Sequence, residues 1–529
     1  MINSLLLITS AQFIDAEMQN EFGPLPPAFL PVGNRLLIEK QIHCISNLPA
    51  RRILTLPSDY ILPSAYNEKL DALRIDVLFV PSTLSLGNSI LYALDSIETK
   101  IDHVYVLYGD TIITEVILTP DDVFSLHVPT TNFSWSYQDS QSENFEISAI
   151  EDGNKKEVVS GFFSFKHPAA LKKMIAESEG DFISALTCYH HEYKLEIVRA
   201  GRWHDFGHLH SYFISRRLFS TERSFNKLLF IDSSVKKSSS QKFKISAEFE
   251  WYEKIPRDLR IFTPQLLSNF EQTDDEASYY LEYLNLCTLS ELYVFGKLPI
   301  ESWSKILLSC ADFLKRCSNH KTNIEHIDIM DLYLPKAIRR LNVFGKDRRI
   351  DIYKKWTFNG RVCQSLMSIA HRAAGELKQA PSSLCVVHGD FCFSNIFFDF
   401  RSGAIKVIDP RGSVSAERST IYGDGRYDLA KLYHSVFGYY DLILADFFSL
   451  KWHNESELTF KIQTTINQER VGKVMLEALF KNNIEDIRSA HAGCILLFLS
   501  MLPLHSDHPE RQDALMANAL RLSAELWPS

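Results

Sequence analysis

The first 215 or so residues alternate short apolar runs with stretches of helical periodicity. Runs of branched and aromatic residues bounded by turn residues predict strands, and apolar residues at helical spacing predict helices between them. The predicted strands are Leu5–Thr9, Arg52–Leu56, Val77–Val80, Val104–Tyr108 and Glu157–Phe165, and the predicted helices are Pro31–Ser46, Gly87–Ile97 and Pro168–Ser178. Such alternation predicts an α/β fold in which crossover helices connect the strands of a sheet.

The pattern changes near residue 218. The stretch Val235–Lys244 is polar and basic after an apolar run, as in a hairpin or a mobile loop. From Glu301 to Trp527 helical periodicity dominates, interrupted by a strand–loop–strand pattern over Cys385–Asp409. We therefore predict three parts, residues 1–218, 219–300 and 301–529.

Composition is that of a folded protein. Of the 529 residues, 46% are hydrophobic and 23% charged, which excludes wholesale disorder. A net charge of −9 argues against a broad nucleic-acid-binding surface. The nine cysteines include no Cys-x-x-Cys pair, as is typical of reduced thiols in a cytoplasmic protein.

We expect neither a signal peptide nor a membrane span. Met1–Ser10 has a short apolar run without a basic flank. No apolar run approaches the roughly 18 residues that cross a bilayer, and Ile495–Leu504 is predicted to be a buried helix.

The strongest chemical signal follows a predicted strand at Leu384–Val387. A His-Gly-Asp turn ends at Asp390, Asn395 comes five residues later, and a second strand ends in Asp409. Phosphoryl transfer from ATP uses one carboxylate to orient the attacking hydroxyl, and an Asn and a second Asp to hold Mg²⁺. A Gly-Asp turn by itself commonly means only a turn, but the strand-end carboxylate favours the catalytic interpretation.

These motifs resemble the aminoglycoside phosphotransferase and choline kinase family, which carries His-Gly-Asp-x-x-x-x-Asn and then a strand-terminal Asp. Tyr422–Ala430 matches the helix start that supports the catalytic loop in that family. The resemblance covers about residues 220–529 and implies a two-lobed, protein-kinase-like α+β domain. It implies that Asp390 is the catalytic base, that Asn395 and Asp409 bind Mg²⁺, and that Asp428 and His388 support the loop.

The rest of this kinase-like site is less strongly marked. Arg411 follows Asp409 where many relatives carry an aromatic residue, and it either reaches a phosphate or an acidic substrate or is an ordinary surface arginine. An N-lobe needs a strand lysine for the phosphates and a helix glutamate to hold that lysine. Candidates are Lys237 or Lys236 for the lysine, Glu248 for the glutamate, Glu222–Asn226 for the nucleotide-covering loop and Tyr280–Leu284 for the hinge.

Four segments of the first part carry a second pattern. They are Pro26–Glu39, the helix-opening Leu86–Ser89, the strand end Val106–Thr111 and Gly201–His208. In this order they resemble the Pro-Lys-Pro-Leu-Leu-Pro-Val, base-contact, Gly-Asp and Trp-x-Asp-x-Gly motifs of the sugar-phosphate nucleotidyltransferases. The resemblance covers about residues 1–217 and implies a Rossmann-like (GT-A-like) domain.

The chemistry of nucleotidyl transfer explains why carboxylates occur there. Attack of a phosphate on the α-phosphorus of an NTP brings two anions together, and a metal held by two carboxylates neutralises them. Asp110 and Asp205 match the metal-binding positions of the family, and Gly87 would let the nucleotide approach the backbone closely.

The phosphate-binding loop of that family is not matched. Thr9–Gly23 has no Arg and no Gly before its end, and Pro27 stands where the family has a lysine. Arg35 and Arg202 are candidate replacements or ordinary surface arginines. Each lost cation removes stabilisation of phosphate charge in the transition state.

The leading hypothesis is a bifunctional cytoplasmic enzyme. With Mg²⁺ and ATP it phosphorylates a small hydroxyl compound (a sugar, polyol or amino alcohol), and with CTP or another NTP it converts the phosphate to a nucleotide diphosphate derivative. By analogy such a pair of steps serves capsule or lipopolysaccharide biosynthesis. The alternatives are a single-activity kinase whose N-terminal domain is a non-catalytic binding or regulatory module, and a pseudoenzyme scaffold. We expect no nucleic-acid partner, and the oligomeric state stays open.

Overall fold

The computed structural model describes the whole chain except residues 1–2, 116–120, 129–134, 139–146, 151–156, 200, 220–226, 232, 323–332, 380–383, 415–417, 482 and 529. The chain forms two compact units. Unit 1 comprises Met1–Ser220 with Phe295–Lys297, and unit 2 comprises Thr221–Val294 with Leu298–Ser529. The predicted nucleotide-covering loop Glu222–Asn226 lies outside the described residues.

Unit 1 is built on a mixed sheet in which nine described strands take part. Its strands are β1 (Ser4–Thr9), β4 (Arg51–Pro57), β5 (Ile75–Val80), β6 (His103–Tyr108), β8 (Val123–His127), β9 (Trp135–Gln138), β10 (Ile147–Ile150), β11 (Glu157–Phe165) and β12 (Glu196–Val198). The helices of this unit are α1 (Ala16–Phe22), α2 (Leu37–Cys44), α3 (Ser64–Ala72), α4 (Leu86–Asp95), α5 (Pro168–Glu177), α6 (Phe182–Tyr193) and α7 (Leu209–Arg217).

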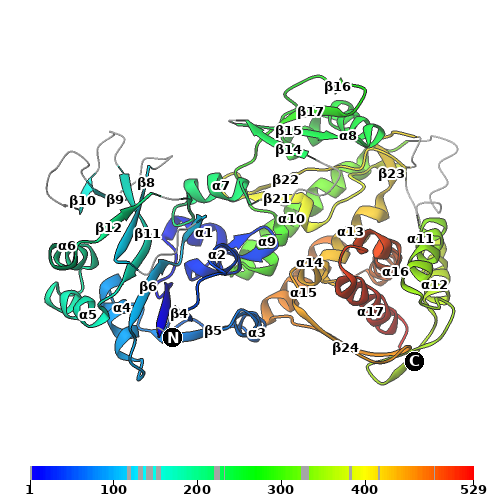
Figure 1. Cartoon of the computed structure of the whole chain (residues 1–529). Helices are drawn as coiled ribbons and strands as arrows, with labels where there is room; N and C mark the ends of the chain where they lie inside the picture. The colour runs from blue at the N-terminus through cyan, green and yellow to red at the C-terminus, as the bar shows by residue number, and fades with distance from the viewer. Residues whose placement is uncertain are drawn as a thin grey trace. The chain divides into compact units, whose positions relative to one another are not determined.

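The middle of this sheet has the order β5–β4–β1–β6, with neighbouring strands parallel, and β11 runs antiparallel to β6 (Figure 1). In chain order the four parallel strands are therefore arranged 3-2-1-4, which is the Rossmann-type arrangement. The α/β, Rossmann-like fold predicted for the first part is confirmed. Because the strand order reverses between β1 and β6, their carboxyl ends flank the crevice where such sheets bind ligands.

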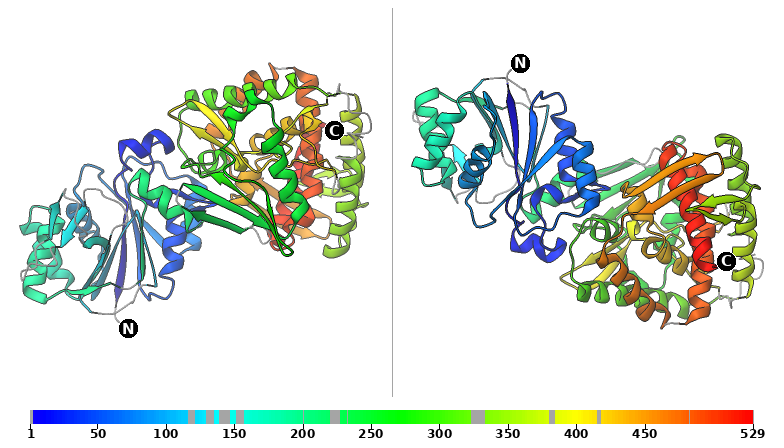
Figure 2. Two further views of the ribbon diagram at one scale, coloured as in Figure 1. Left: turned by 90° about the horizontal axis from the view of Figure 1, so that it is seen from above. Right: turned by 90° about the horizontal axis from the view of Figure 1, so that it is seen from below.

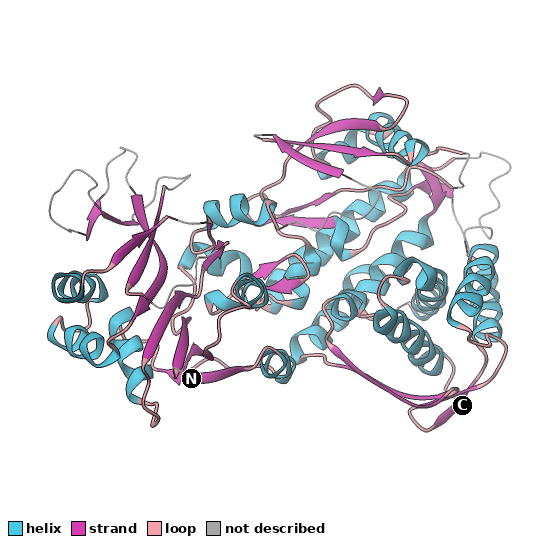
Figure 3. Ribbon diagram, in the orientation of Figure 1, coloured by secondary structure: helices cyan, strands magenta, loops and turns pink. Residues whose placement is uncertain are grey.

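Helices cover both faces of this sheet, as Figure 3 shows. One face packs on α4, α5 and α6 around a core that includes Leu7, Val106, Phe163, Ile90 and Leu171. Strands buried on both faces are expected to be apolar throughout rather than alternating, and the sequence of β1, SLLLIT, has that character.

The helix predicted over Pro31–Ser46 is shorter than expected. Its first residues form a hairpin of β2 (Pro31–Val32) and β3 (Arg35–Leu36), turned by Gly33 at φ +65°. The helix α2 begins at Leu37, because the Glu39 carboxylate accepts a hydrogen bond from the Leu36 N–H (2.7 Å) and caps the first turn. A short second sheet pairs β7 (Thr111–Thr114) with β13 (Arg202–Asp205).

Unit 2 begins with a small antiparallel sheet of order β14–β15–β17–β16, formed by Lys227–Ile231, Ser234–Ser239, Ala277–Glu282 and Glu271–Gln272. The helix α8 (Lys242–Lys254) contacts β15 and β17. The polar stretch Val235–Lys244 is thus a strand and the start of a helix rather than a mobile loop. A sheet with one helix, followed by a helical lobe, confirms the two-lobed kinase-like fold predicted for this part.

The larger lobe is mainly helical. Its helices are α9 (Leu289–Val294), α10 (Ile300–Asn319), α11 (Leu334–Arg348), α12 (Leu366–Gln379), α13 (Gly425–Val436), α14 (Tyr440–Leu444), α15 (Ile466–Phe480), α16 (Ile484–Met501) and α17 (Pro509–Leu526). Its strands are β18 (Trp356–Phe358), β19 (Arg361–Cys363), β20 (Leu384–Val386), β21 (Ile396–Asp399), β22 (Ala404–Val407), β23 (Tyr422–Asp424), β24 (Phe448–Asn454) and β25 (Glu457–Ile462). The sheet β19–β18–β25–β24 was not predicted.

The most apolar helix of the chain lies inside this lobe. In the described residues, Ile484–His505 is long and apolar enough to cross a bilayer by length and composition, but 78% of its most apolar window is buried. It contacts α11, α12, α13 and α17, and Figure 2 shows these helices grouped together. The burial expected for Ile495–Leu504 is confirmed up to Leu502.

Candidate active sites

The predicted catalytic turn of unit 2 connects β20 to β21 through a single helical turn. Gly389 has φ +78°, and a Cβ on it would lie 2.8 Å from the Cβ of Arg411, so a larger residue would be strained and crowded there. The Asn395 side-chain amide donates to the Asp390 carbonyl oxygen (2.9 Å) and to its Oδ2 atom (3.1 Å). The two residues that were predicted to act together are therefore in direct contact.

The side chain of Asp428, near the start of α13, binds the backbone of this turn. Its carboxylate accepts hydrogen bonds from the N–H groups of His388 (2.7 Å) and Gly389 (2.8 Å). Burial raises the pKa of Asp428 to about 7, although the two N–H donors oppose that rise. His388 is fully buried, and burial lowers its pKa to about 4. A neutral buried imidazole is suited to a structural role rather than to proton transfer at neutral pH.

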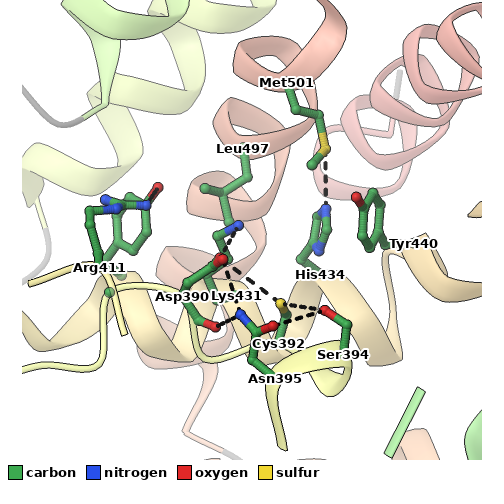
Figure 4. A network of polar contacts seen from close by, with 12 residues as sticks. Asp390, Cys392, Ser394, Asn395, Arg411, Lys431, His434, Tyr440, Leu497 and Met501 are labelled. Atoms are coloured by element: carbon green, nitrogen blue, oxygen red, sulfur yellow. Dashed lines mark hydrogen bonds and ion pairs between the residues drawn. The ribbon is translucent and has the colours of Figure 1, made fainter. Parts of the chain in front are cut away.

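A lysine that the sequence did not single out lies against the Asp390 carboxylate. Lys431 Nζ is 2.7 Å from Asp390 Oδ1 (Figure 4). Burial favours the neutral acid, but Lys431 and Arg411 outweigh it and hold the pKa of Asp390 well below its ordinary value. Lys431 follows Asp428 by three residues on α13, and this spacing places both side chains on one helix face. This three-residue spacing from Asp428 was the feature of the sequence from which a role for Lys431 could have been predicted.

The N-lobe lysine is identified by the register of β15. Lys237 points inward and pairs with Glu248 of α8, and its Nζ lies 2.9 Å from Asp409 Oδ1. Burial alone would lower the pKa of Lys237, but Asp409 and Glu248 raise it above the ordinary value. Neighbouring residues of a strand face opposite sides, and Lys236 accordingly lies 5.3 Å from the ring centre of Tyr280. Of the two candidates, Lys237 is the one that joins the site.

The two predicted metal ligands of unit 2 lie at one end of a hairpin. The Ile408 N–H donates to the Asn395 carbonyl (3.0 Å), which places Asp409 next to Asn395. Asp409 has φ +59° and leaves 44% of its side chain exposed. Amide and carboxylate oxygens are ligands that suit Mg²⁺, which usually takes one or two protein groups together with phosphate and water oxygens. The residues present therefore fit that ion.

Arg411 is half-buried and packs against Tyr427. Its guanidinium lies 4.4 Å from the ring centre of Tyr427 and donates to the Tyr427 hydroxyl at 2.7 Å. Lys336 of α11 reaches the same hydroxyl from 3.4 Å. Burial would raise the pKa of Tyr427, but Arg411, Lys336 and Lys431 together lower it to about 7. The half-buried arginine therefore belongs to a cationic group beside the catalytic turn.

This environment predicts an unusual tyrosine titration. As the pH rises through 7, the phenol of Tyr427 loses its proton about three pH units below an ordinary tyrosine. Because the folded pKa lies below the unfolded one, this ionisation contributes stability that is full above pH 10 and is lost as the pH falls through 7. Absorbance at 295 nm should show one tyrosinate forming near pH 7, and Tyr427→Phe should remove that step alone. A wild-type titration without a step below pH 9 would contradict the assignment.

In unit 1 the two predicted metal-binding aspartates come together at the switch point of the sheet. Asp110 follows β6, and Asp205 ends β13. A Cβ on Gly207 would lie 2.5 Å from Asp110 Oδ2 and 3.3 Å from Asp205 Oδ1, so both carboxylates face this glycine. Burial raises the pKa of Asp110 to about 6, and the nearby charge of Asp205 adds to the rise. Paired carboxylates of this kind fit a divalent cation.

The segment that follows β1 has a different structure from a phosphate-binding loop. It forms the helix α1, and Asp15 caps that helix by accepting the Met18 N–H at 2.7 Å. Met18 and Phe22 are fully buried. A helix N-terminus can bind an anionic ligand, but here a carboxylate of the chain itself occupies part of that position.

The two candidate replacement arginines lie on other elements than α1. Arg35 forms an ion pair with Glu39 (3.3 Å) at the N-terminal end of α2. Arg202 is exposed on β13, where it lies opposite Thr114.

Gly87 has a packing role that the sequence did not reveal. It lies buried in the first turn of α4, where a Cβ would lie 2.5 Å from the carbonyl oxygen of Gly180. The close approach that requires glycine is thus made by the backbone of the chain itself, and the contact of Gly87 with a nucleotide stays a prediction.

No family model and no curated protein matches the chain. Among solved structures, CTP:phosphocholine cytidylyltransferase from Streptococcus pneumoniae is similar over 41% of this chain and 100% of its own, with 13% identity and a TM-score of 0.32. A complex of gentamicin with APH(2″)-IIa is similar over 58% of this chain and 91% of its own, with 15% identity and a TM-score of 0.35. A ternary complex of aminoglycoside phosphotransferase APH(4)-Ia with AMP-PNP and hygromycin B is similar over 59% and 94%, with 14% identity and a TM-score of 0.37.

Proposed function

We propose that unit 2 is a kinase that transfers the γ-phosphoryl group of ATP to a hydroxyl of a small compound. The observation that carries this proposal is the assembled set of Lys237, Glu248 and Asp409 beside the Asp390–Asn395 turn. In protein kinases the lysine–glutamate pair and the metal-binding aspartate must both be in place for turnover. A pseudoenzyme would have no chemical need for the complete set.

Different residues of the site bind the phosphates of ATP and the acceptor hydroxyl. Lys237 binds the phosphates, and Asp390 accepts a hydrogen bond from the acceptor hydroxyl and orients it. The hydroxyl oxygen then bonds to the γ-phosphorus, the bond from that phosphorus to the ADP oxygen breaks, and the hydroxyl proton passes to Asp390. Because its pKa is held low, Asp390 takes that proton late, after the phosphorus–oxygen bond has begun to form, as in a loose transition state. Asn395 and Asp409 would hold Mg²⁺, which supplies neutralisation of phosphate charge.

For unit 1 we propose nucleotidyl transfer to the phosphate that unit 2 produces. The support is the pair Asp110 and Asp205 at the ligand-binding end of the sheet. CTP or another NTP would be the second nucleotide, and pyrophosphate would leave. Two consecutive reactions on one chain suit the supply of activated precursors for capsule or lipopolysaccharide in the cytoplasm.

A second function for unit 1 has its own support. The acidic helix α1 occupies the segment that would bind the triphosphate, Arg35 is paired with Glu39, and Arg202 is exposed on β13. A domain of this kind would bind a nucleotide sugar or the kinase product without catalysing its formation.

The substitution Asp110→Ala in the full chain separates these two functions. If unit 1 is active, the variant should lose pyrophosphate release by at least a hundredfold, because the metal loses one of its two protein ligands. ATP consumption by unit 2 should be unchanged. The matched control is Asp102→Ala, an exposed aspartate before the opposite end of β6. If the wild-type protein releases no pyrophosphate with any of the four common NTPs and the kinase product, the non-catalytic function stands instead.

A further inference from the structure

Three basic side chains gather beside the catalytic turn of unit 2. Lys336 and Arg340 lie one turn apart on α11, and Arg411 follows β22. Lys336 and Arg411 donate to the Tyr427 oxygen, which ionises near pH 7, and Arg340 donates to the Ser500 carbonyl at 2.9 Å. No carboxylate of the described part of the chain lies within ion-pair distance of the three.

These positive charges repel one another. Tyr427 raises the pKa of Lys336, but burial and the charges of Arg411, Arg340 and Lys431 together lower it to about 8. The Tyr427 phenolate balances at most one of these three positive charges, so the group keeps an excess of positive charge that an anionic ligand would neutralise. Lys431 is paired with Asp390, and the charges of Tyr427 and Asp390 also favour the charged form of Arg411.

We propose that the acceptor of the kinase reaction carries a carboxylate or phosphate group, which binds between Lys336, Arg340 and Arg411 while its hydroxyl lies at Asp390. This inference rests on the proposed function of unit 2 and specifies the class of its acceptor.

The charge of the pocket selects against amines. A positive group about 4 Å from one of these cations would be repelled by roughly 1–4 kcal/mol at the dielectric of a partly buried site. Hydroxy acids, sugar acids and phosphorylated polyols are therefore favoured over amino alcohols and polyamines, which narrows the range that the sequence left open.

The phosphates of ATP are a second source of the same negative charge. The ion pairs of Lys237 are with Glu248 and Asp409, and neither of these residues contacts the three cations. We therefore assign the cations to the acceptor and Lys237 to the nucleotide. The experiment measures the affinities for both ligands to separate the two assignments.

The test uses the full chain and isothermal titration calorimetry. Mg-AMP-PNP is titrated first, and acceptor probes are then titrated into the saturated protein. The probes are matched pairs that differ in charge, glycerol 3-phosphate with glycerol and gluconate with glucose, and choline is the cationic probe. We expect at least one anionic probe to bind tenfold or more tightly than its neutral partner, and choline to bind no better than glycerol.

Variants on one helix provide the control. Lys336→Gln should weaken binding of the anionic probe by tenfold or more and leave the affinity for Mg-AMP-PNP unchanged. Lys336→Arg keeps the positive charge and should bind the anionic probe as the wild type does. Lys346→Gln, at an exposed position of the same helix, should match the wild type. Equal binding of charged and neutral partners, binding of no anionic probe, or a loss in Lys336→Gln confined to the nucleotide would overturn the inference. Failure of the wild-type protein to bind Mg-AMP-PNP would instead overturn the proposed kinase function.

Discussion

Asp390→Asn is expected to reduce phosphoryl transfer by about 10²–10⁴-fold while the affinity for Mg-ATP is largely kept. The amide has nearly the shape of the carboxylate and can orient a hydroxyl, but it cannot receive the proton. The measurement is ADP release in the presence of the acceptor, together with nucleotide affinity by calorimetry. Asp399→Asn, at the distal end of the β21–β22 hairpin, is the matched control. Turnover near the wild-type rate would contradict the assignment of the catalytic base.

The same substitution leaves a buried lysine without its counter-charge. Removing one partner of a buried ion pair commonly costs about 3–5 kcal/mol, so lost activity could reflect lost folding. The double variant with Lys431→Met removes both charges of the 2.7 Å pair and should recover the free energy of unfolding. It should not recover turnover, because the proton acceptor is still missing. Recovery of both quantities would assign Asp390 a structural role alone.

Lys237→Met is expected to lower kcat/KM for ATP by about 10²–10³-fold, since a preorganised cation at the phosphates is lost. The neighbouring variant Lys236→Met is the matched control, because the two side chains lie on opposite faces of β15. We expect Lys236→Met to retain activity within about twofold. Equal losses in the two variants would contradict the assignment from the strand register.

Measuring the free energy of unfolding distinguishes a structural role of Lys237 from a role in ATP binding. In Lys237→Met the buried carboxylate of Glu248 has lost its ammonium partner, and Tyr279, which donates to that carboxylate at 2.7 Å, is a weaker substitute. Combining Lys237→Met with Glu248→Gln should raise the free energy of unfolding again without raising kcat/KM. Chemical denaturation and ADP release measure the two effects on the same samples.

Residues that act close together in the chain could be predicted from the sequence. Asp390 follows β20, Asn395 directly precedes β21 and Asp409 follows β22, and their spacing in the sequence predicted that they meet. The first-domain sheet was predicted on the same basis, since its strands are short apolar runs with clear ends. By contrast, the sheet that contains β24 was missed although the strand alternates in burial, because its short strands are surrounded by helices of stronger periodicity.

Contacts between distant segments could not be predicted in this way. Lys336 lies in a helix about fifty residues before the catalytic turn, and nothing in its local pattern relates it to Tyr427. Gly87 was interpreted locally as a nucleotide contact, but Gly180 is its neighbour in space. The choice between Lys236 and Lys237 required the strand register, which two adjacent lysines do not reveal.

The helix α1 limits how unit 1 could change in evolution or by design. Its side chains at Met18 and Phe22 are fully buried, and exchanging such residues for small ones costs about 2–5 kcal/mol each. That is comparable with the whole stability margin of a domain, about 5–15 kcal/mol. A lysine placed at Pro27, or an arginine near Asp15, would add a cation but would leave the helix in place. Gaining a glycine-rich phosphate loop here therefore requires several simultaneous substitutions, each deleterious alone, so point mutation offers unit 1 no gradual route to such a loop.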